Sequence, residues 1–198
     1  MSVKSRQAEN SAATRSALLR VARRLFATRG YADTGTEEVV RRARVTRGAL
    51  YHHFKDKRDL FEAVLDEEQI KIADLVAKAA ATQSDPWSAL LVGSKAFLEA
   101  CLDPAVQQIL LIDAPAVLGW KKWRENDQSH YLEGLKAAIA LSIEQGLIAK
   151  QPTEPLAHVI MGAMNEAALL IAHADDEQAA RREVTTVIER LFAGIRGA

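Results

Sequence analysis

Residues that break helices are scarce in this chain, and they stand between long segments of helical periodicity. The 198 residues include only 5 prolines and 10 glycines. Apolar residues recur three and four positions apart, and no alternating run is long enough for a sheet. Three acid–proline pairs, at 85–86, 103–104 and 154–155, are typical of a helix start. The sequence therefore predicts an all-α protein with nine helices.

The predicted helices divide the chain into two parts behind a polar end. We expect helices near 11–29, 36–43, 46–54, 56–81, 86–102, 104–118, 121–145, 154–174 and 176–195. Residues 1–10 are polar and expected to be frayed or disordered. The first three helices form a predicted N-terminal domain over 11–56, and a larger helical domain covers 57–198.

Charge is distributed unevenly, although the formal net charge is +0. Residues 1–60 carry 14 Lys/Arg against 6 Asp/Glu, or +8, and residues 61–198 carry 12 against 20, or −8. A basic end on an acidic body favours a protein that meets a polyanion such as nucleic acid. An uneven solvated surface is the simpler alternative.

Several function classes find no support in the sequence. No stretch resembles a membrane span of about 18 apolar residues, and the polar first twenty residues predict no secretory signal. Cys101 is the single cysteine, so no internal disulfide can form, and a reducing cytoplasm fits. We expect no cofactor and no metal, because no zinc spacing, phosphate-binding loop or nucleophile motif is present.

Residues 36–54, TEEVVRRARVTRGALYHHF, form two short helices joined by a turn around residues 43–45. Val39, Val45 and Leu50 are spaced to pack against the first helix. The second short helix exposes many donors and is polar, as a helix that enters the DNA major groove is. The segment predicts a helix-turn-helix.

The stretch from Phe26 to Tyr31, FATRGY, together with TRGALYHHFKDKRDLFEAV, resembles the tetracycline-repressor (TetR) family over residues ~12–65. This resemblance implies a TetR-like fold, with a helix-turn-helix domain followed by a ligand-binding and dimerisation domain. It also implies a DNA-binding transcription regulator, by default a repressor. Two positions depart from the usual pattern, since Val40 replaces a small alanine and Arg44 replaces a glycine in the turn.

The resemblance also assigns roles on DNA. Arg47, Gly48 and His52 match positions that face base edges, and an arginine can bond a guanine bidentately. The phosphate-gripping positions correspond to Thr36, Tyr51, His53 and Lys57. Thr46, Lys55 and Arg44 complete the expected DNA-binding set.

Simpler alternatives exist for some of these residues. Tyr51 can belong partly to the core, and Arg41 and Arg42 can be solvated rather than specific. A metal pair of His52 and His53 is disfavoured because adjacent helical residues point about 100° apart.

The last two helices carry apolar residues at helical spacing, and the family resemblance implies that such helices form a four-helix dimer interface. The expected interface residues are Leu156, Val159, Ile160, Ala163, Ala167, Val184, Val187, Ile188, Leu191 and Phe192. The alternative is that both helices face the core of their own chain.

We expect an effector pocket among the middle helices, where apolar walls combine with few polar groups. The candidates are Phe97, Cys101, Leu110, Asp113, Trp120, Trp123, Tyr131, Met161 and Asn165. Asp113 stands out because its burial without a partner would be costly. For each aromatic residue, a place in the core is the alternative.

Three functions remain to be compared. A helical enzyme or small-molecule carrier would leave the basic end unexplained, and a DNA-organising protein would leave the large acidic body unexplained. The sequence favours a ligand-responsive DNA-binding regulator, not an enzyme. Its expected partners are double-stranded DNA, a second copy of itself and an unknown small apolar or amphipathic effector, with no membrane.

Overall fold

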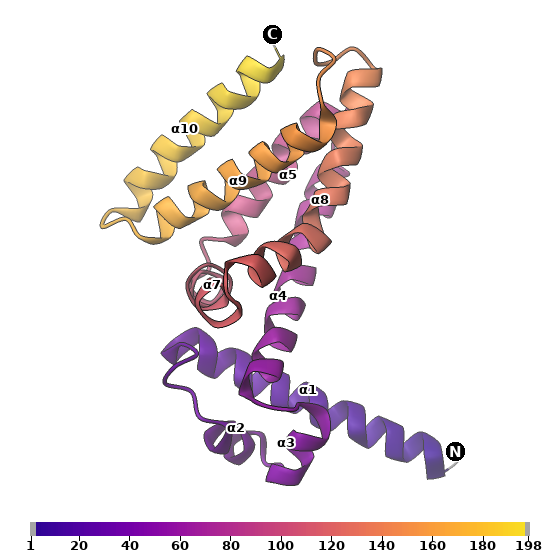
Figure 1. Ribbon diagram of the computed structural model, residues 1–198, viewed down its shortest axis with the longest axis vertical. Coiled ribbons are helices and arrows are strands. Elements are labelled where there is room, and N and C mark those ends of the chain that lie inside the picture. Colours follow the sequence, from indigo (N-terminus) through magenta and orange to yellow (C-terminus); the bar gives the residue numbers. More distant parts are fainter. Residues whose placement is uncertain (1–2, 197–198) are drawn as a thin grey trace.

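A computed structural model describes residues 3–196, with side chains described for 8–126 and 130–196. The elements are α1 (Val3–Arg29), α2 (Thr36–Ala43), α3 (Arg47–His53), α4 (Lys57–Ala80), α5 (Pro86–Ala100), α6 (Pro104–Val106), η1 (Gln107–Asp113), α7 (Ala114–Leu118), α8 (Trp120–Glu144), α9 (Thr153–Ala172) and α10 (Glu177–Arg196). The described residues contain helices and no strand, which confirms the all-α prediction. Figure 1 shows α1–α3 at one end of an elongated molecule and the longer helices behind them.

Two predicted helices differ from those observed. The single helix expected at 104–118 is α6, η1 and α7, so the described chain has ten α-helices and a π-helical segment rather than nine helices. Helix α1 begins at Val3 instead of residue 11, although residues 8–10 are exposed, as expected for a polar end.

The N-terminal head is a three-helix unit around a small apolar core. Leu18, Phe26, Val39 and Leu50 are buried there. The turn between α2 and α3 is closed by Arg44, whose φ of 56° and ψ of 40° are left-handed, and whose N–H caps α2 by donating to Arg41 O and Val40 O. The Thr46 side chain then starts α3 by accepting from Ala49 N at 3.1 Å, the usual role of threonine at a helix start.

Helix α4 connects the head to the body and packs directly against α1. Phe61 meets Phe26 edge-on, with ring centroids 5.2 Å apart. Two turns further on, the buried Glu68 carboxylate accepts from Arg23 of α1 at 2.6 Å and from Lys71 at 2.6 Å. Burial raises the pKa of Glu68, but these two hydrogen bonds outweigh it and hold the pKa below its ordinary value. An ion pair therefore extends the apolar α1–α4 contact.

In the body, α5 and α8 pack against α4, α9 packs against α5 and α8, and α10 packs against α9 and α5 (Figure 1). Trp87 of α5 is buried against Phe192 of α10, with ring centroids 5.6 Å apart. By length and composition α9 could cross a membrane, contrary to the expectation that no stretch resembles a span. Eight of its residues are buried within the protein, and packing against its neighbours accounts for its apolar composition.

The π-helical segment η1 brings the body onto the end of α1. Asp113, its last residue, accepts from Tyr31 N at 2.7 Å. Gly30 has a φ of 76°, and a Cβ there would lie 3.3 Å from Gln108 Nε2. Glycine is therefore favoured at the left-handed end of α1, and its lack of a side chain also leaves room for Gln108 of η1.

Candidate nucleic-acid interface and internal cavity

Helix α3 presents its polar side chains outward while Leu50 anchors it to the core. The Arg47 side chain is 71% exposed, and its guanidinium lies 5.6 Å from the centroid of the Tyr51 ring. Apart from its two chain neighbours, Thr46 is the one described side chain within 4 Å of a Cβ built at Gly48. This end of α3 is therefore open to approach by another molecule.

The predicted phosphate-binding residues lie on α3 and on both sides of it along the chain. Thr36 is the first residue of α2, Tyr51 is 43% exposed, and Lys55 follows α3 on the surface. The exposure of Tyr51 argues against a purely core role for that residue. His52 is exposed and His53 is partly buried. Burial, His52 and Arg15 lower the pKa of His53, so its imidazole offers a hydrogen bond rather than a charge at neutral pH.

Lys57 has a partner within the protein as well as an expected role on DNA. Its ammonium donates to Ala32 O at 3.2 Å and lies 4.2 Å from the centroid of the Tyr31 ring. Burial lowers its pKa, and Asp33 and Asp113 oppose that effect. An ammonium has three donors, so the hydrogen bond from Lys57 to the loop after α1 leaves other donors for a phosphate.

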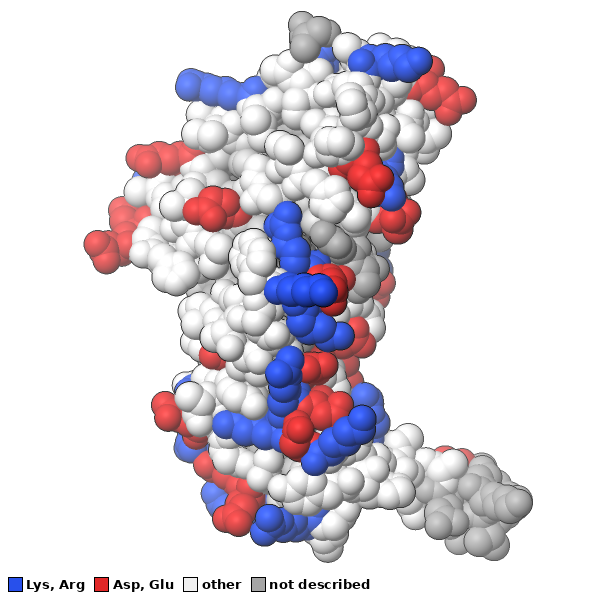
Figure 2. All heavy atoms as spheres, viewed as in Figure 1, with Lys and Arg blue, Asp and Glu red and all other residues white. Residues whose placement is uncertain are grey.

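Basic side chains extend beyond the head. Figure 2 shows Lys and Arg over the head and in a column that continues up the middle of the body, with acidic side chains around it. The N-terminal part of the chain is basic and the rest is acidic in net charge. This face of the body nevertheless carries a column of positive side chains.

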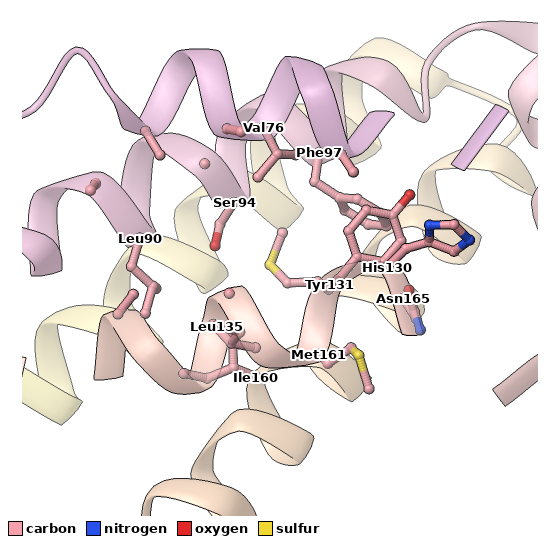
Figure 3. Close-up of a pocket in the computed structure, with 18 residues that line it drawn as sticks. Val76, Leu90, Ser94, Phe97, His130, Tyr131, Leu135, Ile160, Met161 and Asn165 are labelled. Atoms are coloured by element: carbon pink, nitrogen blue, oxygen red, sulfur yellow. The ribbon is translucent and has the colours of Figure 1, made fainter. Parts of the chain in front are cut away.

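A cavity of about 280 Å³ lies within the body. Its lining residues come from four helices, α4, α5, α8 and α9: Ala73, Val76, Ala77, Ala80, Ala89, Leu90, Gly93, Ser94, Phe97, His130, Tyr131, Gly134, Leu135, Ala138, Ile160, Met161, Met164 and Asn165. Figure 3 shows the Tyr131 ring beside Phe97 and the amide of Asn165 near Met161. The described lining is mainly apolar, with Ser94, His130, Tyr131 and Asn165 as its polar members.

Four predicted pocket residues line this cavity: Phe97, Tyr131, Met161 and Asn165. Helix α4 was not expected to contribute, yet it supplies Ala73, Val76, Ala77 and Ala80. The signal available in the sequence was the run of small residues at the end of that helix, which leaves space between α4 and its neighbours.

Five predicted pocket residues are elsewhere. Cys101, Leu110 and Trp123 are buried in the core, and Trp123 Nε1 donates to Leu110 O at 3.2 Å. Trp120 is 64% exposed because it begins α8 at a surface corner. Asp113 faces the head instead of the cavity, where its carboxylate has the partner that its partial burial requires.

The residues predicted to form the dimer interface divide into two sets, one buried and one facing outward. Ile160, Ala167, Ile188 and Phe192 are buried in the core of their own chain, so they cannot form a contact surface, and that part of the prediction was wrong. Val159 and Val187 are each 63% exposed and Leu191 is 39% exposed. Leu156, Ala163 and Val184 are partly buried. Leu170 of α9, 55% exposed, belongs with the outward set.

No group of three or more potential metal ligands occurs among the described residues.

Two family profiles match the sequence: bacterial regulatory proteins of the tetR family over residues 18–64, and the tetracyclin repressor-like C-terminal domain over residues 87–195.

Individual relatives extend the match across the chain. A TetR-family transcriptional regulator from Pectobacterium atrosepticum has a crystal structure with a TM-score of 0.84 and 35% identity, covering 95% of this chain and 96% of that one. The transposon Tn10 TetC protein of Escherichia coli is 26% identical over 162 residues, 82% of each chain. The transcriptional repressor BepR of Brucella suis biovar 1 is 36% identical over 70 residues, 35% of this chain and 34% of its own.

Replacing Asp113 tests the joint between head and body. We expect Asp113→Ala to lower the free energy of unfolding by about 1–3 kcal/mol, because Tyr31 N–H is left without its charged acceptor. Asp113→Asn keeps an acceptor oxygen and should be destabilised less. Denaturant unfolding of both variants measures the difference, and equal stability of all three proteins would contradict a structural role for this hydrogen bond.

Proposed function

The chain belongs to the TetR family of DNA-binding transcriptional regulators, and we propose that it is a cytoplasmic repressor that binds a palindromic operator as a homodimer and is released by a small apolar or amphipathic effector. The observation that carries this proposal is the geometry of α3. A capped seven-residue helix, fixed by one buried leucine, presents an exposed arginine and a glycine at its first turn.

Sequence is read by the first turn of α3 in this proposal. The major groove is about 12 Å wide and admits a helix. Arg47 can donate two parallel hydrogen bonds to a guanine, and Gly48 lets the helix backbone approach the bases. The flanking phosphates are held by side chains that fix the register without reading sequence, namely Thr36, Tyr51, His53, Lys55 and Lys57.

Two copies associate through the outward faces of α9 and α10. Val159, Leu170, Val187 and Leu191 are exposed apolar residues on these two adjacent helices, and a self-complementary apolar face supports a two-fold dimer. The dimer sets two copies of α3 about 34–36 Å apart, the spacing of successive major grooves on one side of the duplex.

The cavity provides a route from effector to head, because three hydrogen bonds join α8 to α4 beside it. Tyr131 Oη donates to Gln69 O at 3.2 Å, and Asn126 Nδ2 donates to Gln69 Oε1 at 2.6 Å. His130 Nε2 lies 3.0 Å from Asp66 Oδ1. Tyr131 and His130 also line the cavity. An effector that displaces these side chains shifts α4, and with it the head to which the start of α4 is attached.

Two single substitutions distinguish base readout from phosphate binding. Their effects are measured on an operator that the wild-type protein selects from random duplexes. Arg47→Ala should cost about 1–3 kcal/mol of discrimination at one base pair in each half-site. Lys55→Ala removes the same charge but should leave base preference unchanged. It should lower the slope of log affinity against log salt by about 0.9 for each phosphate that is no longer neutralised. Altered base preference in the lysine variant would refute its assignment to phosphate.

Dimerisation is tested by Val187→Asp, which places a charge on the outward face without disturbing the core. We expect sedimentation analysis to show a monomer, and operator affinity to fall by about 100-fold or more, because two half-sites are no longer held together. Leu75→Asp is the matched control, since Leu75 of α4 is 52% exposed and lies off this face. A dimeric Val187→Asp protein would place the interface elsewhere.

Effector binding is tested by filling the cavity. A Cβ at Gly134 meets no atom within 4 Å, and Gly134 lines the cavity, so Gly134→Leu should place additional side-chain atoms in the cavity. We expect the neutral fluorescent probe 1-aminoanthracene to bind the variant about tenfold more weakly than the wild type, with operator affinity unchanged. Ala140→Leu, on the exposed side of the same helix, is the control. Undiminished probe binding by Gly134→Leu would exclude the cavity as the site.

A further inference from the structure

A second concave surface lies on the head, and arginines dominate its lining. The groove, about 910 Å³, is lined by Arg20, Val21, Arg23, Arg24, Leu25, Ala27, Thr28, Arg41, Arg42, Arg44 and Ala105. It is formed by α1, the C-terminal end of α2, the turn after it and one residue of α6, and no described residue of α3 lines it. We call this surface, with its six arginines, the arginine groove.

Carboxylates balance only part of this charge. Arg23 pairs with Glu68 at 2.6 Å and approaches Asp103 at 3.9 Å. Arg41 and Arg42 share Glu38, at 3.5 and 2.7 Å, and Arg29 also pairs with Glu38.

The other three arginines, Arg20, Arg24 and Arg44, have no ion pair among the described residues. All three are exposed. Guanidinium groups gathered in a concave surface repel one another and raise the local concentration of polyanions.

Arg44 gives an independent indication that the groove has a ligand. Its left-handed backbone, φ 56°, makes it the only non-glycine residue with positive φ in the described chain. A glycine would adopt this conformation at a saving of roughly 1 kcal/mol. Strain of this kind is typical of functional sites, and here the strained residue carries a guanidinium into the groove. In addition, Nε of Arg23 is buried without a hydrogen-bond partner.

We propose that the arginine groove binds phosphates of the DNA duplex that lie outside the major-groove segment read by α3. This inference rests on the proposed function, because it extends the same interface. Arg44 stands two residues before Thr46, which caps α3, so the groove reaches the turn that leads into the reading helix. The planar fork of a guanidinium matches two phosphate oxygens, and phosphate contacts add affinity without reading sequence.

The test compares two duplexes and uses the full-length dimer. One duplex carries the selected operator with about 10 extra base pairs, one helical turn, on each side, and the other is trimmed to the two half-sites. On the long duplex, Arg20→Gln/Arg24→Gln should lower the salt slope by about 0.9 for each phosphate left unneutralised, up to about 3–4 per dimer. On the trimmed duplex the slope should match that of the wild type, and base preference should be unchanged on both.

The control for this comparison is Lys78→Gln/Lys150→Gln. It removes the same charge from exposed positions of the body and should change neither slope.

Arg44→Gly separates a role on DNA from a role in folding. Its thermal midpoint should equal or exceed that of the wild type, because glycine relieves the left-handed strain. Its affinity for the long duplex should nevertheless fall by roughly three- to tenfold, because each protomer then lacks one charge-assisted hydrogen bond to a phosphate.

Three outcomes would overturn the proposal. The first is an unchanged salt slope of the double variant on the long duplex, and the second is an equal decrease on both duplexes. The third is unchanged DNA binding combined with loss of inorganic tripolyphosphate binding, which would assign the groove to a small anion. If the wild-type protein selected no operator from random duplexes, the proposed function itself would fail, and the two failures are therefore distinguishable.

Discussion

The packing of α4 against α1 is the contact on which the rest of the structure depends. Phe61 fills the space beside Phe26 and Tyr31, and Glu68 continues the contact as an ion pair with Arg23. Glu68 is the buried member of this pair, and its carboxylate keeps Lys71 as a second partner at 2.6 Å, because a buried charge is costly unless it is paired. The head is thereby fixed to a helix whose other half lines the cavity.

Helix α4 therefore contributes to two regions that are far apart in the molecule, the head and the cavity of the body. The first turns of α4 lie beside α3, and its last turns supply Ala73, Val76, Ala77 and Ala80 to the cavity wall. A second connection runs through η1, where Asp113 holds the end of α1. π-Helical segments are rare and are often found at functional sites. Here Asp113, the last residue of the segment, accepts a hydrogen bond from Tyr31 N of the head, so the body contacts the head through η1 as well as through α4.

The arginines of the head divide between two kinds of interaction. Arg47 is the one arginine of α3, where its exposed guanidinium lies 3.9 Å from the Glu37 carboxylate, and we propose that it meets a base. The arginine groove concentrates charge where no residue of α3 contributes. Readout by bases needs few donors in a fixed geometry. Electrostatic attraction to phosphates tolerates many donors and variable geometry. Under this proposal, phosphate contacts account for the basic charge of the first 60 residues that a seven-residue reading helix does not use.

The sequence by itself determined the helix-turn-helix and the all-α class, because both depend on contacts between residues near one another in the chain. The packing positions Val39, Val45 and Leu50 were evident from local spacing, and the family resemblance identified Arg44 as a departure from glycine in the turn. The cap at Thr46 emerged only from the structure, where α3 begins at Arg47. Tertiary structure alone decided which apolar faces meet. Ile160 and Phe192 face their own core while Val159 and Val187 face outward, since helices apolar on more than one face carry no local sign of their neighbours. For the same reason, the sequence did not show that Asp113 contacts the head rather than the pocket, or that α4 lines the cavity.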